Sequence, residues 1–302
     1  MDTSPSPAPL QAPRKVYIVT PTFNALHWLP RCVRSVADQA GNGVHIHHHV
    51  QDGGSTDGAQ EWLEQWSREH ANLPGYTFSY ACGKDKGMYD AINIAWDLMP
   101  EDCFMAAHLN SDEQYLPGAI LKMTREMERR PQAEVLLGTY IIVDADNRYV
   151  CHRRPVMPKA WSSWLNCACI TNSSFYRAEM MRRVKPRFDI RWKSVGDLVF
   201  YRDLLWRHVR FETLPEMVTS VFVCTGNNLA WTPLTDDELR DLHSEAPWLP
   251  RVTSWPTARW VNLQRRIVNL FCPAPRSYTC YDADVPEPVE HRIEHPTVIW
   301  KR

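Results

Sequence analysis

Residues 103–113 read CFMAAHLNSDE, an apolar run that ends in two neighbouring acids, Asp112 and Glu113. A short apolar run of this kind predicts a buried strand of a parallel sheet. In an open α/β sheet, ligands bind outside the carboxyl ends of the strands, so both acids would lie in a ligand crevice. Adjacent carboxylates repel each other unless a cation or hydrogen-bond donors offset the repulsion. We therefore expect Asp112 to hold a divalent cation, and a solvated loop acid is the alternative.

Upstream of this stretch, strand and helix patterns alternate along the chain. Each predicted strand is a short apolar run, and each helix that follows has apolar residues at helical spacing. This alternation is typical of a mostly parallel sheet with right-handed crossovers and helices on both faces, a Rossmann-like α/β fold. The predicted strands are 15–20, 44–50, 76–80 and 103–109, and helices follow near 29–36, 62–66, 88–96 and 117–129.

Polar loops follow three of these strands, at 22–24, 52–54 and 110–112. The carboxyl ends of parallel strands meet at one edge of the sheet, so the three loops should converge there. Convergence of this kind is typical of a nucleotide site.

After Pro131 the pattern predicts a mixed sheet edge with helices, which we interpret as the acceptor side of a cleft. One helix should open at 194–197 and turn Leu198, Tyr201, Leu205 and Trp206 inward. The predicted strands of this half are 135–143, 148–153, 170–176 and 217–223, and a helix carries Met180, Met181 and Val184.

The expected domain organisation has three parts. A Pro-rich tail, 1–14, should be disordered, and 15–230 should form one α/β domain with a nucleotide-binding half (15–130) and an acceptor half (131–230). A less regular helical extension, 231–302, should follow. Within it, 255–271 has the pattern of a basic amphipathic helix, which could lie on an anionic membrane surface. Packing back on its own domain is the alternative that we favour, because the helix is short.

Composition excludes several classes of protein. The 302 residues are 44% hydrophobic and 23% charged, with a formal net charge of −1, so no global basic field points to nucleic acid. Nine cysteines, an odd number without a CxxC pair, suit thiols in a reducing compartment. No apolar run reaches the ~18 residues of a membrane span. The N-terminus lacks a signal-peptide pattern, so we expect a cytoplasmic protein.

Four motifs in order resemble family 2 glycosyltransferases, inverting enzymes with the GT-A fold. They are VTPTFN (19–24), QDGGSTDG (51–58), KDKGMYDAIN (84–93) and LNSDE (109–113). Weaker matches follow at 173–177, 195–198 and 225–227, so the resemblance covers about 15–230. Together the four motifs are specific, although each alone would be weak. The resemblance implies a nucleotide-sugar donor, commonly UDP-linked.

The resemblance also implies roles for individual residues. It assigns Asp112 as the main metal ligand of a DxD-type motif, with Glu113 beside it, and Asp197 as the general base. Thr22 and Phe23 would line the base pocket, and Asp52 would accept a hydrogen bond from the base. Asp85 and Gly87 would help to bind the nucleoside. Asn24, together with Asn110 and Ser111 of the metal motif, would also bind the nucleotide-sugar, and Asn172 and Asn227 would be weaker acceptor contacts.

Three positions depart from the family pattern. Glu113 stands where an Asp is common, Thr171-Asn172 stand where His-Gln is common, and Val199 replaces a second Asp of the acidic motif. These departures concern acceptor recognition more than donor binding.

The chemistry explains why such groups are needed. Displacing a nucleoside diphosphate leaves charge on the departing phosphate, and Mg²⁺ or Mn²⁺ stabilises that charge. On the opposite face of the sugar, a carboxylate such as Asp197 can take the proton of the attacking hydroxyl, a role worth on the order of 10²- to 10⁴-fold in rate. Attack opposite the leaving group inverts the anomeric centre, so an α-linked donor would yield a β-linked product.

Several residues also have structural interpretations. Asp197 could cap a helix, Asp52 could organise the turn at Gly53, and Asn227 is first a turn signal. The histidines of 45–49 would alternate between strand faces, which argues against a metal site. Trp161 and Trp164 are expected in the core, and a stacking platform for an acceptor sugar is the alternative. Cys167 and Cys169 are expected to be buried thiols.

Three functional hypotheses result. The leading one is a metal-dependent inverting transferase that moves a sugar to a hydroxyl of a glycan or lipid-linked acceptor in polysaccharide or surface-glycan synthesis. A nucleotidyltransferase would share the metal-bound diphosphate but would not need Asp197. A catalytically silent nucleotide-sugar binder or scaffold is conceivable because of Glu113 and Val199.

Overall fold

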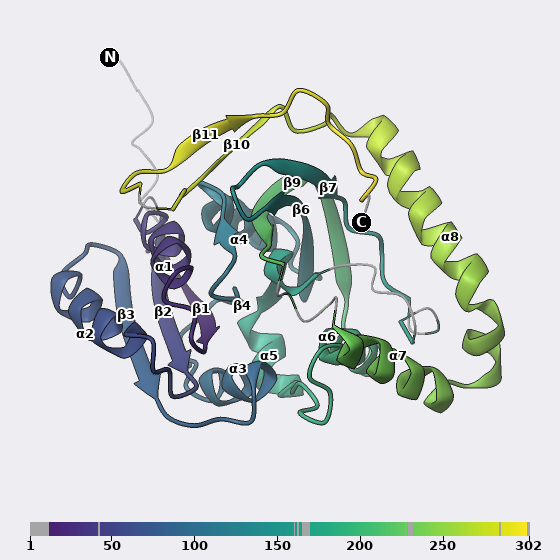
Figure 1. Ribbon diagram of the computed structural model, residues 1–302, viewed down its shortest axis with the longest axis horizontal. Helices are drawn as coiled ribbons and strands as arrows, with labels where there is room; N and C mark the ends of the chain where they lie inside the picture. The colour runs from purple at the N-terminus through teal and green to yellow at the C-terminus, as the bar shows by residue number, and fades with distance from the viewer. Residues whose placement is uncertain are drawn as a thin grey trace, which may run out of the picture.

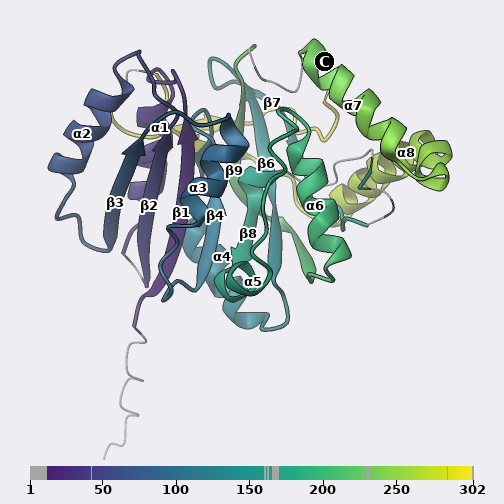
Figure 2. The ribbon, with the colours of Figure 1, turned by 90° about the horizontal axis from the view of Figure 1, so that it is seen from below.

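A nine-stranded sheet with helices on both faces organises the molecule (Figures 1 and 2). The computed structural model describes residues 12–41, 43–159, 161, 163–164, 170–226, 228, 232–283 and 285–300. The strand order is β3-β2-β1-β4-β8-β6-β9-β5, with β7 paired to β6. The predicted α/β fold with helices on both faces is therefore confirmed.

The first half is the predicted parallel array. β1 (Arg14–Thr22), β2 (Val44–Asp52), β3 (Tyr76–Cys82) and β4 (Met105–His108) are parallel neighbours. In the register, Thr22 lies beside Asp52 and Asp52 beside Cys82, while Val19 lies beside His108. The polar loops after these strands therefore emerge at one edge of the sheet, as predicted.

Alternation along β1 divides the core between the two faces. Val16 and Ile18 pack with α1 (Leu29–Ala37), α2 (Ala59–Glu69) and α4 (Ala119–Arg129) on one face. Tyr17 and Val19 pack with α3 (Met88–Trp96), α5 (Ala178–Val184) and α6 (Gly196–Trp206) on the other, the near face in Figure 2. The period of two along a strand is the physical cause of this division.

The second half is mixed, with β8 and β5 antiparallel to their neighbours. Its strands are β5 (Gln114–Tyr115), β6 (Val135–Asp144), β7 (Tyr149–Arg153), β8 (Ser174–Arg177) and β9 (Phe211–Cys224). One strand prediction was wrong in part: Thr171–Ser173 form a 3-10 turn, and β8 begins only at Ser174.

Two predicted core positions were also wrong. Trp206 is 52% exposed, because it lies at the last turn of α6, where its ring contacts only one edge of Trp164 and the Arg202 guanidinium among the ring and cation contacts of the described residues. Trp161 is 48% exposed, whereas Trp164 is buried as expected. The described cysteines are free thiols, although Cys82 is exposed, and Cys167 and Cys169 lie outside the described residues.

The histidines of β2 bind hydroxyl groups of neighbouring strands rather than one another. His45 contacts the Thr77 hydroxyl, and His47 and His49 share the Ser79 hydroxyl. His48 is fully buried between the hydroxyls of Thr20 and Tyr76. Burial lowers the pKa of His48 to about 3, so its imidazole is neutral at physiological pH.

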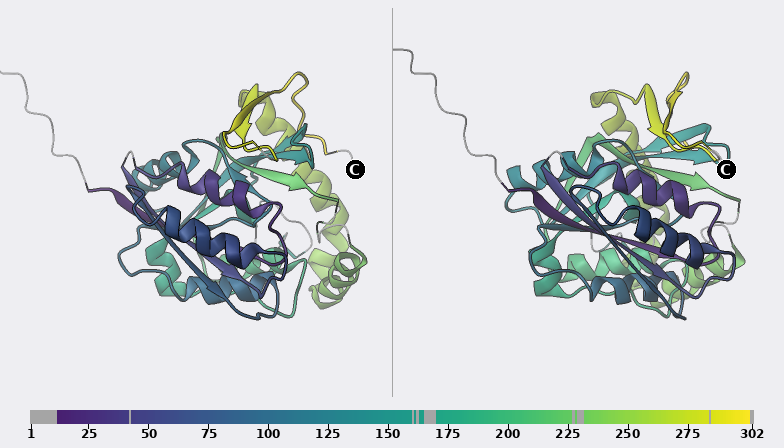
Figure 3. Two further views of the ribbon diagram at one scale, coloured as in Figure 1. Left: turned by 60° about the vertical axis from the view of Figure 1, so that its left-hand side comes forward. Right: turned by 90° about the vertical axis from the view of Figure 1, so that its left-hand side faces the viewer.

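The C-terminal extension is far more regular than predicted. It contains α7 (Pro233–Glu245), α8 (Trp248–Phe271) and a hairpin of β10 (Ser277–Cys280) and β11 (Val289–Arg292). The hairpin lies across the sheet near β6 and β9 (Figure 3), where Tyr278, Cys280 and Ile293 pack on Ile141, Val143 and Val221. None of the described helices is long and apolar enough to cross a bilayer.

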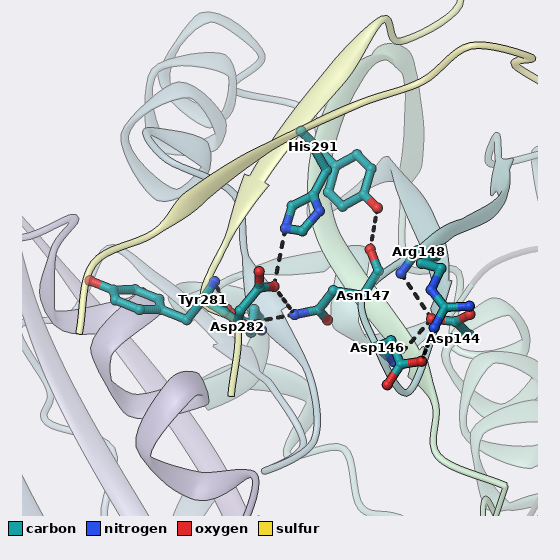
Figure 4. A network of polar contacts seen from close by, with 9 residues as sticks. Asp144, Asp146, Asn147, Arg148, Tyr281, Asp282 and His291 are labelled. Carbon is teal, nitrogen blue, oxygen red and sulfur yellow. Dashed lines mark hydrogen bonds and ion pairs between the residues drawn. The ribbon is translucent and has the colours of Figure 1, made fainter. Parts of the chain in front are cut away.

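Polar contacts hold the hairpin in place (Figure 4). The Asn147 side chain donates to the Tyr281 carbonyl at 3.0 Å and to the Asp282 carboxylate at 2.6 Å. His291 Nε2 lies 3.1 Å from the same carboxylate, and Cys280 is nearby. We interpret these groups as a clamp on the hairpin, because Asp282 is already occupied by two partners.

Candidate active site

The loops after β1 and β2 are joined by side-chain hydrogen bonds. The backbone N–H of Asn24 donates to Ser55 Oγ at 2.8 Å, and the N–H of Thr56 donates to Asn24 Oδ1 at 2.9 Å. Asn24 adopts a φ of 48°, a left-handed conformation that asparagine tolerates. Asn24 thus holds the two loops together beside the predicted base pocket, and its contact with a nucleotide stays a prediction.

Asp52 organises its own loop. Its buried carboxylate accepts hydrogen bonds from the N–H groups of Gly54 and Ser55, both at 3.0 Å, from the Ser55 hydroxyl, and from Gln60 Nε2 at 3.1 Å. Four donors match the acceptor capacity of a carboxylate. The turn role weighed from the sequence is therefore present, and a contact between Asp52 and the base stays a prediction.

Asp85 brings the loop after β3 to the same rim. A Cβ atom at Gly53 would lie 2.8 Å from Asp85 Oδ2, so only glycine allows the Asp85 carboxylate to lie against this backbone. Asp85 accepts a hydrogen bond from the N–H of Gly87 at 2.7 Å. Burial raises the pKa of Asp85, and the Gly87 hydrogen bond opposes that rise. Asp85 and Gly87 thus lie beside the Gly53 turn.

At the end of β1, the Thr22 side chain is buried and the neighbouring Phe23 side chain is exposed. The Thr22 hydroxyl is buried and has no hydrogen-bond partner among the described residues. The Phe23 ring is 62% exposed, which is unusual for a large apolar side chain at the end of a buried strand. An exposed ring at a rim of polar loops can stack on a planar base.

The acidic motif after β4 is tightly folded. The N–H of Glu113 donates to the Asn110 carbonyl, and the N–H of Asn110 donates to Glu113 Oε2, both at 2.9 Å. Ser111 is buried within this turn. The reciprocal bonds place Glu113 back under the turn, with its other oxygen, Oε1, buried and without a hydrogen-bond partner among the described residues.

The two carboxyl groups fit a cation. Burial raises the pKa of Asp112 to about 6, and burial together with the Asp112 charge raises the pKa of Glu113 well above its usual range. The amides of Asn110 and Asn172 oppose that rise at Glu113. A half-buried carboxylate (Asp112) beside a buried one (Glu113), with an unsatisfied oxygen on Glu113, supplies the hard donors that Mg²⁺ or Mn²⁺ prefers. Asn172, predicted as an acceptor contact, lies beside this motif.

Asp197 lies in the first turn of α6. Its Oδ1 accepts a hydrogen bond from the N–H of Leu198 at 2.8 Å, and its own N–H donates to the Tyr89 hydroxyl at 3.3 Å. The N-cap residue of α6 is Val195, so Asp197 is not the N-cap residue that the alternative interpretation required. Its carboxylate does, however, bind one N–H group of the first turn. A Cβ at Gly196 would lie 2.4 Å from the Tyr89 ring, which explains the glycine before Asp197.

Contacts between the Asp197 turn and the loop after β3 hold these two segments together. Lys193 Nζ donates to the Lys86 carbonyl at 2.6 Å, next to Asp85 and Gly87. Beneath it, Phe188 stacks between Tyr89 of α3 and Phe200 of α6, at centroid distances of 4.7 Å and 4.2 Å. The packing of α6 on α3 therefore brings Asp197 to the sheet edge that also carries the acidic motif.

The sequence reasoning missed Glu238, a residue of α7. Its carboxylate accepts hydrogen bonds from the N–H groups of Lys193, Ser194 and Val195 at 2.6, 2.8 and 3.1 Å. These three amides lead directly into the turn that carries Asp197. The C-terminal extension thus fixes the turn that carries Asp197. No local sequence pattern predicts a contact across more than forty residues. Asn227 lies outside the described residues.

This combination of a parallel sheet, converging polar loops and an acidic motif after β4 defines the GT-A class of nucleotide-sugar enzymes. The family model described as glycosyl transferase family 2 matches residues 17–194, more than half of the chain. The chain belongs to that family and is a glycosyltransferase that uses a nucleotide-sugar.

Solved structures share this fold at low sequence identity. TarS 1–349 of S. aureus, in complex with UDP-GlcNAc, has a TM-score of 0.55 and 13% identity, and the match covers 84% of this chain and 73% of that one. The mannosyltransferase PcManGT of Pyrobaculum calidifontis, in complex with GDP-Man and Mn²⁺, has a TM-score of 0.55 and 16% identity, covering 88% and 80%. Against a longer TarS chain, with 16% identity and a TM-score of 0.54, the match covers 80% of this chain but only 44% of the other. The search of curated proteins finds no match.

Proposed function

We propose that the protein is a metal-dependent inverting glycosyltransferase. Asp112 and Glu113 would hold a divalent cation against the donor diphosphate, and Asp197 would act as general base. The observation that supports this most is the pair of adjacent carboxyl groups after β4, half-buried at Asp112 and buried at Glu113. Hydrogen bonds of Tyr89 and Lys193 hold the Asp197 turn against α3 and the loop after β3, at the same edge of the sheet. The resident metal, Mg²⁺ or Mn²⁺, would stabilise the charge of the departing nucleoside diphosphate.

The remaining steps belong to the side chains. The polar loops around Asn24 and Asp85 would orient the nucleoside, with Phe23 against the base. A hydroxyl of the acceptor would attack from the side of Asp197, which takes its proton and hands it to solvent. Attack from the face opposite the diphosphate inverts the anomeric carbon. Holding both substrates in one cleft would contribute as much as the proton transfer.

For the substrates, we propose a UDP-linked donor and a hydroxyl of a glycan or lipid-linked acceptor, in polysaccharide or surface-glycan synthesis at the cytoplasmic side of a membrane. The UDP-GlcNAc and GDP-Man complexes of the two structural neighbours support a nucleotide-sugar donor in general. The family resemblance favours UDP.

A panel of UDP-, GDP- and dTDP-sugars tests the donor. Binding to the folded state alone raises stability, so the true donor is expected to raise Tm only when Mn²⁺ or Mg²⁺ is present. At a donor concentration a hundredfold above Kd, the free energy of unfolding should rise by about 2.7 kcal/mol. Turnover should then release a nucleoside diphosphate. Release of pyrophosphate would instead identify a nucleotidyltransferase and refute the proposed reaction.

Glu238→Ala tests the positioning of the acceptor side. It leaves the three amide donors of 193–195 without their acceptor, so stability should fall by about 1–3 kcal/mol, and kcat should fall more than metal-dependent donor binding. Glu245→Ala, at an exposed position of the same helix, is the matched control and should change neither. Equal behaviour of the two variants would show that Glu238 does not position Asp197.

A further inference from the structure

The outward side of α8 is an unusual surface for a folded chain. Trp248, Leu270 and Phe271 are 73%, 80% and 82% exposed. The other large apolar side chains that α8 exposes are Leu249, Val252, Trp255, Trp260, Leu263 and Ile267. Single exposed apolar residues are ordinary, but a contiguous set on one element marks an interaction surface. We call these nine residues the outward face of α8.

Helix geometry shows that this exposure is systematic. At about 100° per residue, the outward face occupies an arc of roughly 160° along the whole helix. The buried residues Pro250, Thr257, Val261 and Arg265 lie on the opposite side. The amphipathic pattern in the sequence was interpreted as packing against the protein. Apart from Val261 and the half-buried Val268, however, the helix turns its large apolar side chains away from the protein.

The helix is held firmly in this orientation. At its C-terminal end, the buried Arg154 donates to Asn269 Oδ1 at 3.0 Å and to the carbonyls of Cys272 and Pro273 at 3.1 and 2.9 Å. At its N-terminal end, Arg251 donates to carbonyls at the end of α7. The outward face is therefore presented by a fixed element, which lies at the side of the molecule in Figure 1.

The positive charge of α8 favours a partner with a negatively charged surface. Residues 248–271 include four arginines and no aspartate or glutamate, whereas the whole chain has a net charge of −1. Arg251, Arg259 and Arg266 are exposed on the Trp255 side of the outward face, Arg259 and Arg266 within its arc and Arg251 just beyond it. The Arg259 guanidinium lies 3.8 Å from the centroid of the Trp255 ring. Arginines on one side of a face rich in tryptophan and leucine suit an anionic lipid surface.

From these observations we propose that α8 lies flat on an anionic membrane, with its outward face inserted among the lipids and its arginines against the head groups. At 24 residues it is about 36 Å long, which matches helices that lie in the interface plane. The proposal deepens the proposed function. Through α7 and Glu238, the bound helix would set the Asp197 side of the cleft relative to the membrane, where a lipid-linked acceptor resides.

Vesicle sedimentation of the full chain tests the proposal. Binding is expected to phosphatidylcholine vesicles that contain phosphatidylglycerol, to weaken on vesicles of phosphatidylcholine alone, and to weaken with salt. Leu263→Glu/Leu270→Glu should reduce binding at least about tenfold, because charges would enter the apolar region. Leu98→Glu, at an exposed apolar position far along the chain from α8, is the matched control and should bind as the unmodified protein does.

The outcomes separate this proposal from the proposed reaction. In the double variant, metal-dependent donor binding and turnover of a soluble acceptor should be unchanged, which also demonstrates folding. Retained vesicle binding in that variant would overturn the proposal. A second result would also overturn it: the unmodified protein self-associates and does not bind vesicles, and the double variant is monomeric. The outward face would then be an interface between two copies.

Discussion

Replacing Asp197 with Asn is expected to lower kcat by about 10²- to 10⁴-fold and to leave metal-dependent donor binding nearly unchanged. Asparagine keeps the size of the side chain and can still accept the hydrogen bond that Leu198 donates, so the first turn of α6 should persist. It cannot take a proton from the attacking hydroxyl. The loss should therefore appear in single-turnover rates with donor and metal saturating.

The control for this variant is Asp203→Asn, two turns further along α6, where the carboxylate pairs with Arg207 on a partly exposed surface. Exposed pairs of this kind contribute about 0–1 kcal/mol, so its kcat should equal that of the unmodified enzyme. If Asp197→Asn kept full activity in the cell, the chain would act as a nucleotide-sugar binder or scaffold. Stalled turnover with donor affinity retained would exclude the scaffold hypothesis.

Replacing Asp112 with Asn is expected to have two opposite effects. Stabilisation by donor and Mn²⁺ should disappear, because a neutral amide is a poor ligand for a hard cation. The metal-free protein should become more stable by about 2 kcal/mol at neutral pH, because burial makes the Asp112 charge costly. Thermal unfolding with EDTA and with donor plus Mn²⁺ measures both effects.

The sign of the second effect follows from the pKa. A carboxyl whose pKa is raised on folding, here to about 6, favours the folded state at low pH. Its contribution is lost as the pH rises through that value, so at neutral pH the charge destabilises the fold. The metal-free protein should thus lose stability between about pH 4 and pH 6, and Asp112→Asn should lose less. The control, Asp102→Asn, alters an exposed pair with Lys15 ahead of the same strand and should keep the metal response.

Much of the first half could be predicted because its signals are local. Apolar runs and helical spacing identified β1 to β4 and the helices between them, and topology rules placed their polar loops at one edge. Two elements could not be predicted from local patterns. β5 spans only two residues, too few to show any periodicity, and α7 has only a weak apolar stripe. The aromatic layer around Phe188 and the Glu238 contacts join distant segments, which no window of sequence reveals.

By itself, then, the sequence determined the parallel sheet, the family and the acids from which a site would be built, because these depend on residue type and spacing. Only the tertiary structure decided that Tyr89 and Lys193 bring the Asp197 turn to the loop after β3, that Glu238 fixes this turn, and that α8 faces outward. An amphipathic period specifies a stripe along a helix, not what covers it. That choice depends on which side the rest of the chain can bury, and here a buried arginine and a threonine lie inward while tryptophan and leucine lie outward.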